Sequence, residues 1–403
     1  MSCLVARESS SWGRAVRVLA LGAVGALVAA CTSAGNTSAG ATKPTSSPVV
    51  QVSLDGSLAT PDGSWAVVKM GHLDELANTF WQLFVLRRGA SRWSLVTPSG
   101  FADNGGLVAT SARGTQLVTG FQANQLNHFS PLAVTSDGGR TWAPGVLGQA
   151  LAAVPDAIAA SATGEMLALV GGQASSILWS AGNLSDWQEL VSEKSLAASA
   201  PGRRCAVTTL TAVSFTSGGE PLVGAICSRA GSVGIFEHAG QSWRSFAPRL
   251  PASVRHATTQ VVRLTFANGT VFAVIAANTG PLRALFAARF LPGLSEWAVS
   301  GALVLPQSAQ VLSSGTSSGG GVFVALSSGT AERVEAQAAF NGSWRQLPAV
   351  PVGTATVAFP LPGRVDAFVS RGSMLTDYTL DASQDRWRRA QVIEVPIQYG
   401  SSS

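Results

Sequence analysis

The sequence has few charged residues. Its 27 Lys+Arg and 22 Asp+Glu residues make up only 12% of 403 residues, and the only lysines are Lys43, Lys69 and Lys194. Hydrophobic residues make up 46%, so the chain has too little charge and too much apolar surface to remain disordered. The net charge of +5 includes no Lys/Arg block, which gives no support for a nucleic-acid partner.

The sequence also lacks the motifs of common catalytic and metal sites. Its four histidines stand alone, without an H-x-H or HExxH pair, and no CxxC occurs. No G-x-S-x-G elbow is predicted, because the match at 315–319 lies in the run SSGTSSGGG (313–321), which is interpreted as an extended hairpin turn without a following helix pattern. There is no P-loop or dinucleotide fingerprint. We therefore expect no resident metal or cofactor.

An apolar stretch near the N-terminus predicts export. Arg7, Arg14 and Arg17 precede 13 uncharged residues at 18–30, which end in small side chains. This pattern is typical of a signal peptide, because 13 residues are too few for a helix to span a bilayer core of about 30 Å. A stop-transfer segment is the alternative interpretation.

The sequence LVAAC at 27–31 resembles the lipobox of bacterial lipoproteins. The resemblance implies that residues 1–30 are removed and that Cys31 is lipidated, which would anchor the protein on the extracytoplasmic face of the cell membrane. An ordinary secretory signal with a chance cysteine is the alternative. Residues 31–48 are rich in Ser, Thr, Gly and Ala and predict a flexible tether. Without the leader, 24 basic and 21 acidic residues remain, a formal charge of +3.

The two remaining cysteines predict a disulfide. Cys205 and Cys227 flank two apolar runs joined by a turn at 217–220. Antiparallel pairing across that turn would bring the thiols together, so we expect a structural disulfide in an oxidising compartment. A redox or metal role is less favoured, because neither CxxC nor a neighbouring histidine is present.

Seven tryptophans recur at similar intervals along the rest of the chain. They are 43 to 56 residues apart: Trp93, Trp142, Trp187, Trp243, Trp297, Trp344 and Trp387. Before most of them the sequence has three short apolar strands separated by turns, and the Trp opens a fourth strand. The pair Asn268-Gly269 between two apolar runs is a strong hairpin signal of this kind.

A four-stranded unit repeated about every 40–50 residues predicts an all-β fold of the β-propeller type. Stacked sheets cover each other, and closing the ring removes exposed ends. The 355 residues at 49–403 give seven blades of about 51 residues, with six or eight as alternatives. A two-domain β-sandwich and a β-solenoid are less favoured, because neither explains the recurring Trp.

One turn indicates the type of repeat. The sequence TSDGGRTW at 135–142 fits the pattern Ser/Thr-x-Asp-x-Gly-x-Ser/Thr-Trp/Phe and resembles the Asp-box of the BNR-repeat, sialidase-like propellers. The resemblance implies a structural turn at the periphery of the propeller. Thr135, Asp137, Gly139, Thr141 and Trp142 are its defined positions: the Asp accepts backbone hydrogen bonds, the Gly allows positive φ, and the Trp packs on the sheet.

Sialidases belong to the Asp-box propellers, so glycan hydrolysis is a second hypothesis. The chain lacks the Arg-Ile-Pro segment of sialidases, and its only tyrosines are Tyr378 and Tyr399. Another glycosidase would need two carboxylates about 5–10 Å apart. The candidates are interpreted as turn or rim residues, because no spacing selects a pair: Asp74, Glu75, Asp103, Glu165, Asp366 and Asp377.

Two irregular segments interrupt the repeat. A long loop contains His72, Asp74, Glu75 and Trp81, and long propeller loops often carry binding sites. The alternative is that the Trp81 side chain packs between two blades. The second segment is a basic loop at 200–204, just before Cys205.

Together these features predict a lipid-anchored, extracytoplasmic β-propeller. We expect a monomer that uses no cofactor and serves as a binding, scaffold or assembly module for an envelope protein or glycan. A glycoside hydrolase with divergent catalytic residues is the alternative. No sequence feature identifies the ligand.

Overall fold

The computed structural model describes most of one compact unit, Pro48–Ser403. The described ranges are 51–60, 63–71, 79–90, 92–97, 107–113, 116–121, 132–145, 155–171, 174–181, 186–267, 269–280, 282–317, 320–328, 331–337, 340, 343–349, 355–359, 363–371, 374–381 and 385–394. Cys31, the tether, His72, Asp74, Glu75 and Asp103 lie outside them. Within these ranges, no helix has the length and apolar character needed to cross a membrane.

The described chain is nearly all β and folds into antiparallel meanders of four consecutive strands. The first sheet contains β1 (Gln51–Thr60), β2 (Gly63–Gly71), β3 (Thr79–Arg87) and β4 (Ser94–Leu95). The second contains β5 (Leu107–Arg113), β6 (Gln116–Phe121), β7 (Leu132–Thr135) and β8 (Ala143–Gly145). The third contains β9 (Ala157–Ala160), β10 (Met166–Val170), β11 (Ser176–Ser180) and β12 (Gln188–Ser192).

The next sheet has nine strands and contains two successive four-stranded meanders that pair with each other. Its first meander is β13 (Val207–Phe215), β14 (Pro221–Cys227), β15 (Gly234–Ala239) and β16 (Ser242–Ser245). Its second is β17 (Thr258–Ala267), β18 (Thr270–Thr279), β19 (Leu282–Leu291) and β20 (Glu296–Val299). A short pairing of β14 with β17 joins the two meanders. The ninth strand, β21 (Leu303–Pro306), pairs with β19.

Two further four-stranded sheets complete the described chain. One contains β22 (Gln310–Thr316), β23 (Val322–Ser328), β24 (Ala331–Gln337) and β25 (Trp344–Gln346). The other contains β26 (Ala355–Ala358), β27 (Asp366–Arg371), β28 (Met374–Asp381) and β29 (Arg386–Glu394). The interpretation of 313–321 as a hairpin turn is wrong for residues 313–316, because they belong to β22. Directly after β22, Ser317 Oγ accepts the Gly321 N–H at 2.7 Å.

The middle strands of the meanders are apolar on both faces. In β18, all seven residues from Val271 to Ala277 are buried. This pattern arises because each sheet is covered by a neighbour on either side, as expected for stacked sheets.

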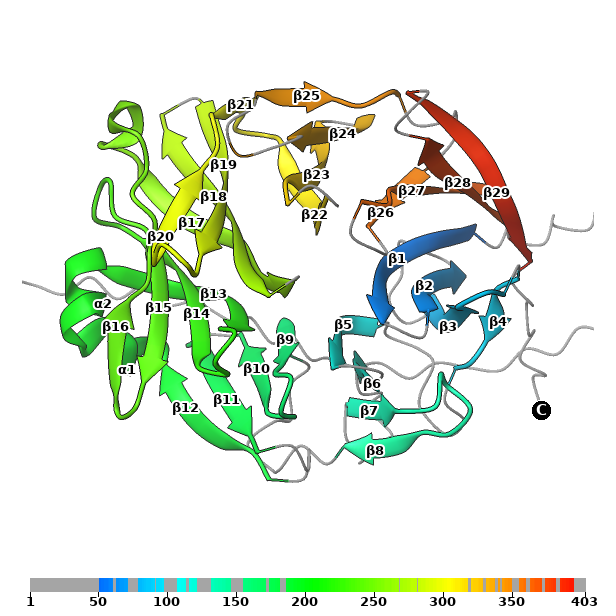
Figure 1. Ribbon diagram of the computed structural model, residues 1–403, viewed down its shortest axis with the longest axis horizontal. Helices are drawn as coiled ribbons and strands as arrows, with labels where there is room; N and C mark the ends of the chain where they lie inside the picture. Colours follow the sequence, from blue (N-terminus) through cyan, green and yellow to red (C-terminus); the bar gives the residue numbers. More distant parts are fainter. Residues whose placement is uncertain are drawn as a thin grey trace, which may run out of the picture. The chain divides into compact units, whose positions relative to one another are not determined.

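Consecutive sheets pack on each other, and the last sheet packs on the first. Ala66, Val68 and Phe84 of the first sheet form one buried cluster with Phe368 and Leu375 of the last. Figure 1 shows the result within this unit: the first strand of each meander lies on the inside, and the red and orange strands β26–β29 lie beside the blue β1. The sheets therefore curl into a closed arrangement of the β-propeller type, and side-chain packing joins its two ends.

The recurring tryptophans lie in the outer strand of each meander or directly before it, as predicted. In several meanders the indole Nε1 donates to a carbonyl just after the outer strand of the preceding meander. The pairs are Trp142 with Val96 (2.9 Å), Trp297 with Phe246 (2.8 Å), Trp344 with Gly301 (2.8 Å) and Trp387 with Pro348 (3.1 Å). The period of the tryptophans therefore reflects a repeated contact between neighbouring sheets.

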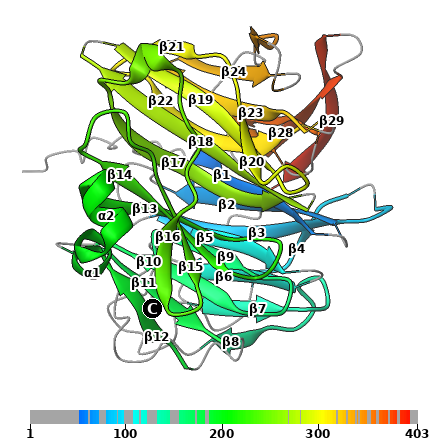
Figure 2. The ribbon, with the colours of Figure 1, turned by 60° about the vertical axis from the view of Figure 1, so that its left-hand side comes forward.

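Two short helices interrupt the repeat between β12 and β13. They are α1 (Glu193–Ala198) and α2 (Ala200–Cys205), and Figure 2 shows them beside β13. The prediction of a basic loop at 200–204 is therefore wrong. Ser199 caps α2 by accepting the Gly202 N–H at 3.1 Å, and Pro201 occupies its first turn, where a missing N–H costs nothing.

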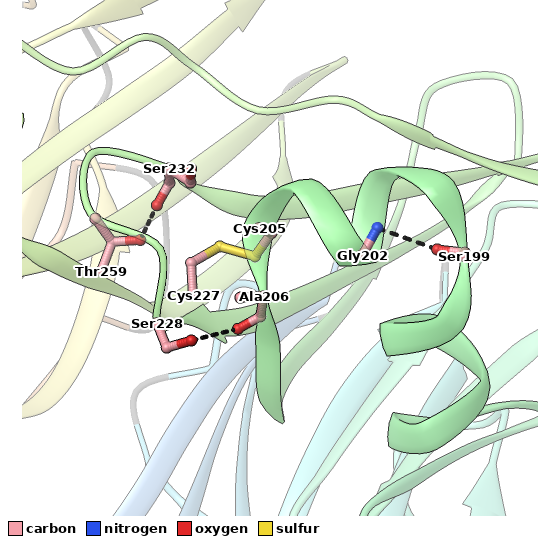
Figure 3. The surroundings of a disulfide bond; sticks show 8 residues. All are labelled: Ser199, Gly202, Cys205, Ala206, Cys227, Ser228, Ser232 and Thr259. Atoms are coloured by element: carbon pink, nitrogen blue, oxygen red, sulfur yellow. Dashed lines mark hydrogen bonds between the residues drawn. A yellow bond between two sulfur atoms is a disulfide. The ribbon is translucent and has the colours of Figure 1, made fainter.

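The predicted disulfide between Cys205 and Cys227 is present, with Cα atoms 5.0 Å apart (Figure 3). The β13–β14 register explains it, since Val207 lies opposite Cys227. Both cysteines are buried. The bond links the end of α2 to the end of β14 and fixes the helices to the sheet.

Candidate binding site

The Asp-box forms the turn between β7 and β8. Asp137 accepts hydrogen bonds from Arg140 N (3.0 Å), Thr141 N (3.0 Å), Thr141 Oγ1 (2.6 Å) and Thr135 Oγ1 (2.8 Å). Those from Thr141 contribute most to holding the pKa of Asp137 far below its ordinary value. Both carboxylate oxygens accept bonds from the turn itself, so the geometry is that of a structural turn.

The glycines of the Asp-box allow it to contact the preceding sheet. Gly138 and Gly139 have φ of +72° and +80°, and a Cβ on Gly139 would lie 2.7 Å from Cβ of Val96. Arg87, at the end of β3, donates from Nη2 to the Gly138 carbonyl at 2.9 Å. The turn thus connects two neighbouring sheets at the periphery.

Two of the candidate carboxylates, Asp366 and Asp377, lie close together in the last sheet. Arg364 donates from Nε to both oxygens of Asp366 (2.9 and 2.8 Å), and its Nη2 is 3.7 Å from Oδ2 of Asp377. Both carboxylates have no exposed surface, so their interpretation as turn or rim residues is wrong. The β27–β28 register accounts for this, because it sets Thr379 opposite Asp366 and Phe368 opposite Asp377.

Burial makes this pair unsuitable as a hydrolytic site. Loss of solvent raises the pKa of Asp377 to about 7, and the charge of Asp366 adds to the effect. A glycosidase also raises the pKa of one carboxyl, but its carboxyls face a cleft that admits the sugar. Here both side chains are enclosed, so the pair belongs to the packing between sheets.

The other candidates from the sequence do not form a site within the described residues. Glu165 lies in the turn between β9 and β10, where Ser161 Oγ accepts its N–H at 2.9 Å, as expected for a turn residue. Trp81 lies in β3 opposite Lys69, so its assignment to the long loop is wrong. Within the described ranges, no group of three or more His, Cys, Asp or Glu residues could hold a metal ion.

A pocket of about 290 Å³ lies between the β13–β16 and β17–β20 meanders. Turns of both meanders, strands β15 and β16 of the first and strands β17, β18 and β19 of the second contribute to its lining. The lining residues are Thr216, Ser217, Gly218, Glu220, Glu237, Arg244, Phe246, Phe266, Gly269, Thr270, Val271, Phe290 and Pro292. The lining combines aromatic rings, hydroxyl groups and three charged side chains, so it can contact a ligand that is partly apolar and partly polar.

Aromatic rings form the apolar part of this pocket. The Phe246 and Phe290 ring centroids are 4.5 Å apart, and Trp297 packs on both at 5.4 and 5.6 Å. The Trp297 indole also donates to the Phe246 carbonyl, which fixes the cluster. Phe266, on the inner strand β17, remains 37% exposed and is available to a ligand.

An ion pair and a hydrogen bond hold the charged side chains of the pocket in place. Arg244 and Glu237 face each other across β15 and β16, with Nε and Oε2 2.5 Å apart. The Glu237 side chain is 4% exposed and that of Arg244 63%, so a buried carboxylate holds an exposed guanidinium. Thr216 donates its hydroxyl to Glu220, which lowers the pKa of Glu220 and keeps it ionised.

Sequence reasoning did not identify this pocket. The turns at 216–220 and 266–270 occupy the same place in successive repeats, so the period could have indicated that they are neighbours. Packing of the two meanders brings Glu237, Arg244 and Phe290 together, and no local sequence pattern predicts this contact.

No protein-family model matches the chain, and no curated protein matches it. Solved structures of β-propeller proteins do match. A GH74 enzyme of Niastella koreensis is 14% identical with a TM-score of 0.51, over 81% of this chain and 52% of that chain. An oligogalacturonate lyase in complex with manganese is 9% identical with a TM-score of 0.51, over 80% and 87%. YCF48 bound to D1 peptide is 14% identical with a TM-score of 0.45, over 87% and 94%. The two matches with a TM-score of 0.51 show a shared fold, and at 14% and 9% identity they assign no activity.

Proposed function

We propose that this chain is a seven-bladed β-propeller that acts as a non-catalytic binding module on the extracytoplasmic face of a membrane. The blade number is supported by the strand order: five four-stranded sheets and the two meanders of the nine-stranded sheet make seven. Each meander has one of the recurring tryptophans in or next to its outer strand.

The pocket between the β13–β16 and β17–β20 meanders is the observation that supports binding. Its aromatic rings suit an apolar side chain, and Glu220 and Arg244 suit polar groups of the same ligand. We infer that it holds a segment of an envelope protein. Its carboxylates do not favour hydrolysis, because Arg244 pairs with Glu237 and the pKa of Glu220 is lowered, whereas a general acid needs a raised pKa.

The membrane location is supported by the sequence alone. The apolar stretch at 18–30 and the LVAAC sequence lead us to propose that Cys31 carries the lipid. A Cys31→Ala chain should be released from membranes when the wild type is not. If the variant stays firmly bound, the lipid anchor is wrong.

A photo-crosslinking amino acid at Phe266 tests the binding site in intact cells. We expect it to link a defined partner, whereas the same group at the exposed Val304, on β21, should not. With the partner purified, Arg244→Ala should weaken binding about 10-fold, equivalent to about 1.4 kcal/mol. A parallel glycan-cleavage assay addresses the alternative: sugar release that is lost in Glu220→Gln would replace binding with hydrolysis.

A further inference from the structure

Four arginines form a second surface, around the disulfide. Arg203 and Arg204 lie in the last turn of α2, Arg229 follows Cys227, and Arg255 follows a short 3-10 helix (Ala252–Val254) before β17. All four are exposed. We name Arg203, Arg204, Arg229 and Arg255 the cationic surface.

Covalent and backbone contacts hold these segments together. Arg229 N donates to the Cys205 carbonyl at 3.1 Å, and Gly231 N donates to the Ala257 carbonyl at 2.9 Å. A Cβ on Gly231 would lie 2.7 Å from the Arg255 carbonyl oxygen, so these two loops touch. Figure 3 shows Ser228 hydrogen-bonded to Ala206 beside the disulfide. The guanidinium groups therefore extend from a fixed base.

No acidic side chain among the described residues pairs with the cationic surface. Arg203 donates to the carbonyl of Ala198, and Arg255 donates to His256 at 3.0 Å. Some exposed arginines elsewhere do have carboxylate partners, such as Arg388 with Asp381 at 2.8 Å. In a chain with only 12% charged residues, four arginines without such partners in one place form a marked positive field.

The cationic surface lies on the face of the propeller where the chain enters β1. Within a meander the first strand begins beside the end of the second, as the pairing of Gln51 with Gly71 and of Val207 with Cys227 shows. In a propeller these ends of successive meanders lie on the same face. The third strands begin there too. Their first residues Leu282, in β19, and Met374, in β28, are 47% and 48% exposed. Cations and exposed apolar side chains on one face are typical of surfaces that contact a membrane.

We propose that the cationic surface docks on anionic phospholipid headgroups and turns this face of the propeller toward the membrane. The inference rests on the lipid anchor of the proposed function, because a chain anchored before β1 would bring this face to the bilayer. Arginine suits the task, since its planar guanidinium binds a phosphate through two parallel hydrogen bonds. An acidic protein segment fits the charges but accounts for neither the entry point of β1 nor the exposed Leu282 and Met374.

Hydrogen exchange of the full-length protein on vesicles tests this docking. The vesicles contain either phosphatidylcholine alone or phosphatidylcholine and phosphatidylglycerol at about 7:3. Amides of 199–206 and 228–232 should exchange at least about 5-fold more slowly on the anionic vesicles, and about 0.5 M salt should remove the difference. Arg204→Gln/Arg229→Gln should abolish it. The control Arg386→Gln/Arg389→Gln removes the same charge from exposed positions of β29 and should leave it unchanged.

Other results would overturn the proposal. Equal exchange rates on both vesicle types would overturn it. Equal loss of protection in Arg204→Gln/Arg229→Gln and in Arg386→Gln/Arg389→Gln would also overturn it. Protection by a soluble glutamate decapeptide but not by anionic vesicles would identify a surface for an acidic protein segment instead. Flotation on phosphatidylcholine vesicles, compared between wild type and Cys31→Ala, reports the anchor separately. If the anchor fails while the lipid-dependent protection persists, only the proposed anchor is lost.

Discussion

Asp366 and Asp377 are fully enclosed but differ in their hydrogen-bond partners. Asp366 accepts from Arg364 and from the Thr379 hydroxyl at 2.8 Å. Asp377 accepts from Gln391 at 3.1 Å through Oδ2, and its Oδ1 has no partner among the described residues. The negative charge therefore remains on Asp366, and the proton belongs on Asp377.

This difference predicts how stability changes with pH. The pKa of Asp377 is raised to about 7, against about 3.9 in an unfolded chain. Between these values the folded state binds one more proton, so the free energy of unfolding falls as pH rises. Asp377→Asn stays neutral, so it should be more stable than the wild type at pH 8 by up to about 4 kcal/mol, and the advantage should shrink toward pH 4. Chemical denaturation across this pH range measures it.

A matched variant separates this effect from loss of packing. Asp366→Asn removes the carboxylate that pairs with Arg364, whose side chain is only 27% exposed. This variant should therefore be less stable than the wild type at every pH, because a largely buried cation loses its partner. If the free energies of unfolding of the wild type and Asp377→Asn changed with pH in parallel, Asp377 would be ionised in the folded protein. The prediction of a raised pKa would then be wrong.

At the scale of elements, the outer-strand tryptophans connect neighbouring meanders. The Trp142 indole donates to the Val96 carbonyl of the preceding sheet at 2.9 Å. The Nε1 of Trp93 is buried and has no partner among the described residues, although its ring packs on Phe368 at 6.2 Å. The two tryptophans occupy equivalent places and differ in this hydrogen bond.

Replacement of each by phenylalanine measures that bond. Trp142→Phe should lower the free energy of unfolding by about 1 kcal/mol more than Trp93→Phe, because only the first change leaves a carbonyl without its donor. Thermal and denaturant unfolding of both variants provide the values. Equal losses would mean that the recurring Trp acts through ring packing alone.

Elements were the most predictable part of this structure. The strands and hairpins around the tryptophans and the Cys205–Cys227 bond depend on residues close in sequence, where apolar runs, Gly turns and the register set the outcome. The helices α1 and α2 were missed because an insertion has no second copy with which to compare it. Its local signals were the caps at Ser192 and Ser199 and Pro201 in the first turn of α2.

At the scale of the whole molecule, packing between the first and last sheets closes the ring. Phe368 is 1% exposed and packs on the first sheet next to Trp93. The β1–β4 and β26–β29 meanders each consist of consecutive strands, so none of the described strands is exchanged between them. The closure therefore depends on side chains at this junction.

Phe368→Ala should open the ring at this junction first. We expect a loss of about 3–5 kcal/mol, as for other buried phenylalanines, with faster hydrogen exchange in β1–β4 and β26–β29 than elsewhere. Phe286→Ala removes an equally buried ring from β19 and should increase exchange around β17–β19 instead. Uniformly faster exchange in both variants would show that the ring opens as a single cooperative unit.

The repeat, the order of strands within it, the Asp-box turn and the disulfide follow from local sequence, because each depends on neighbours within one meander. Which side chains from different turns meet depends on the tertiary packing. It enclosed Asp366 and Asp377, joined Arg244 and Glu237 to rings from the next meander, and gathered arginines from three segments around the disulfide. The physical reason is that these sites lie where sheets or separate loops pack, and packing is set by shape and burial across the chain rather than by local pattern.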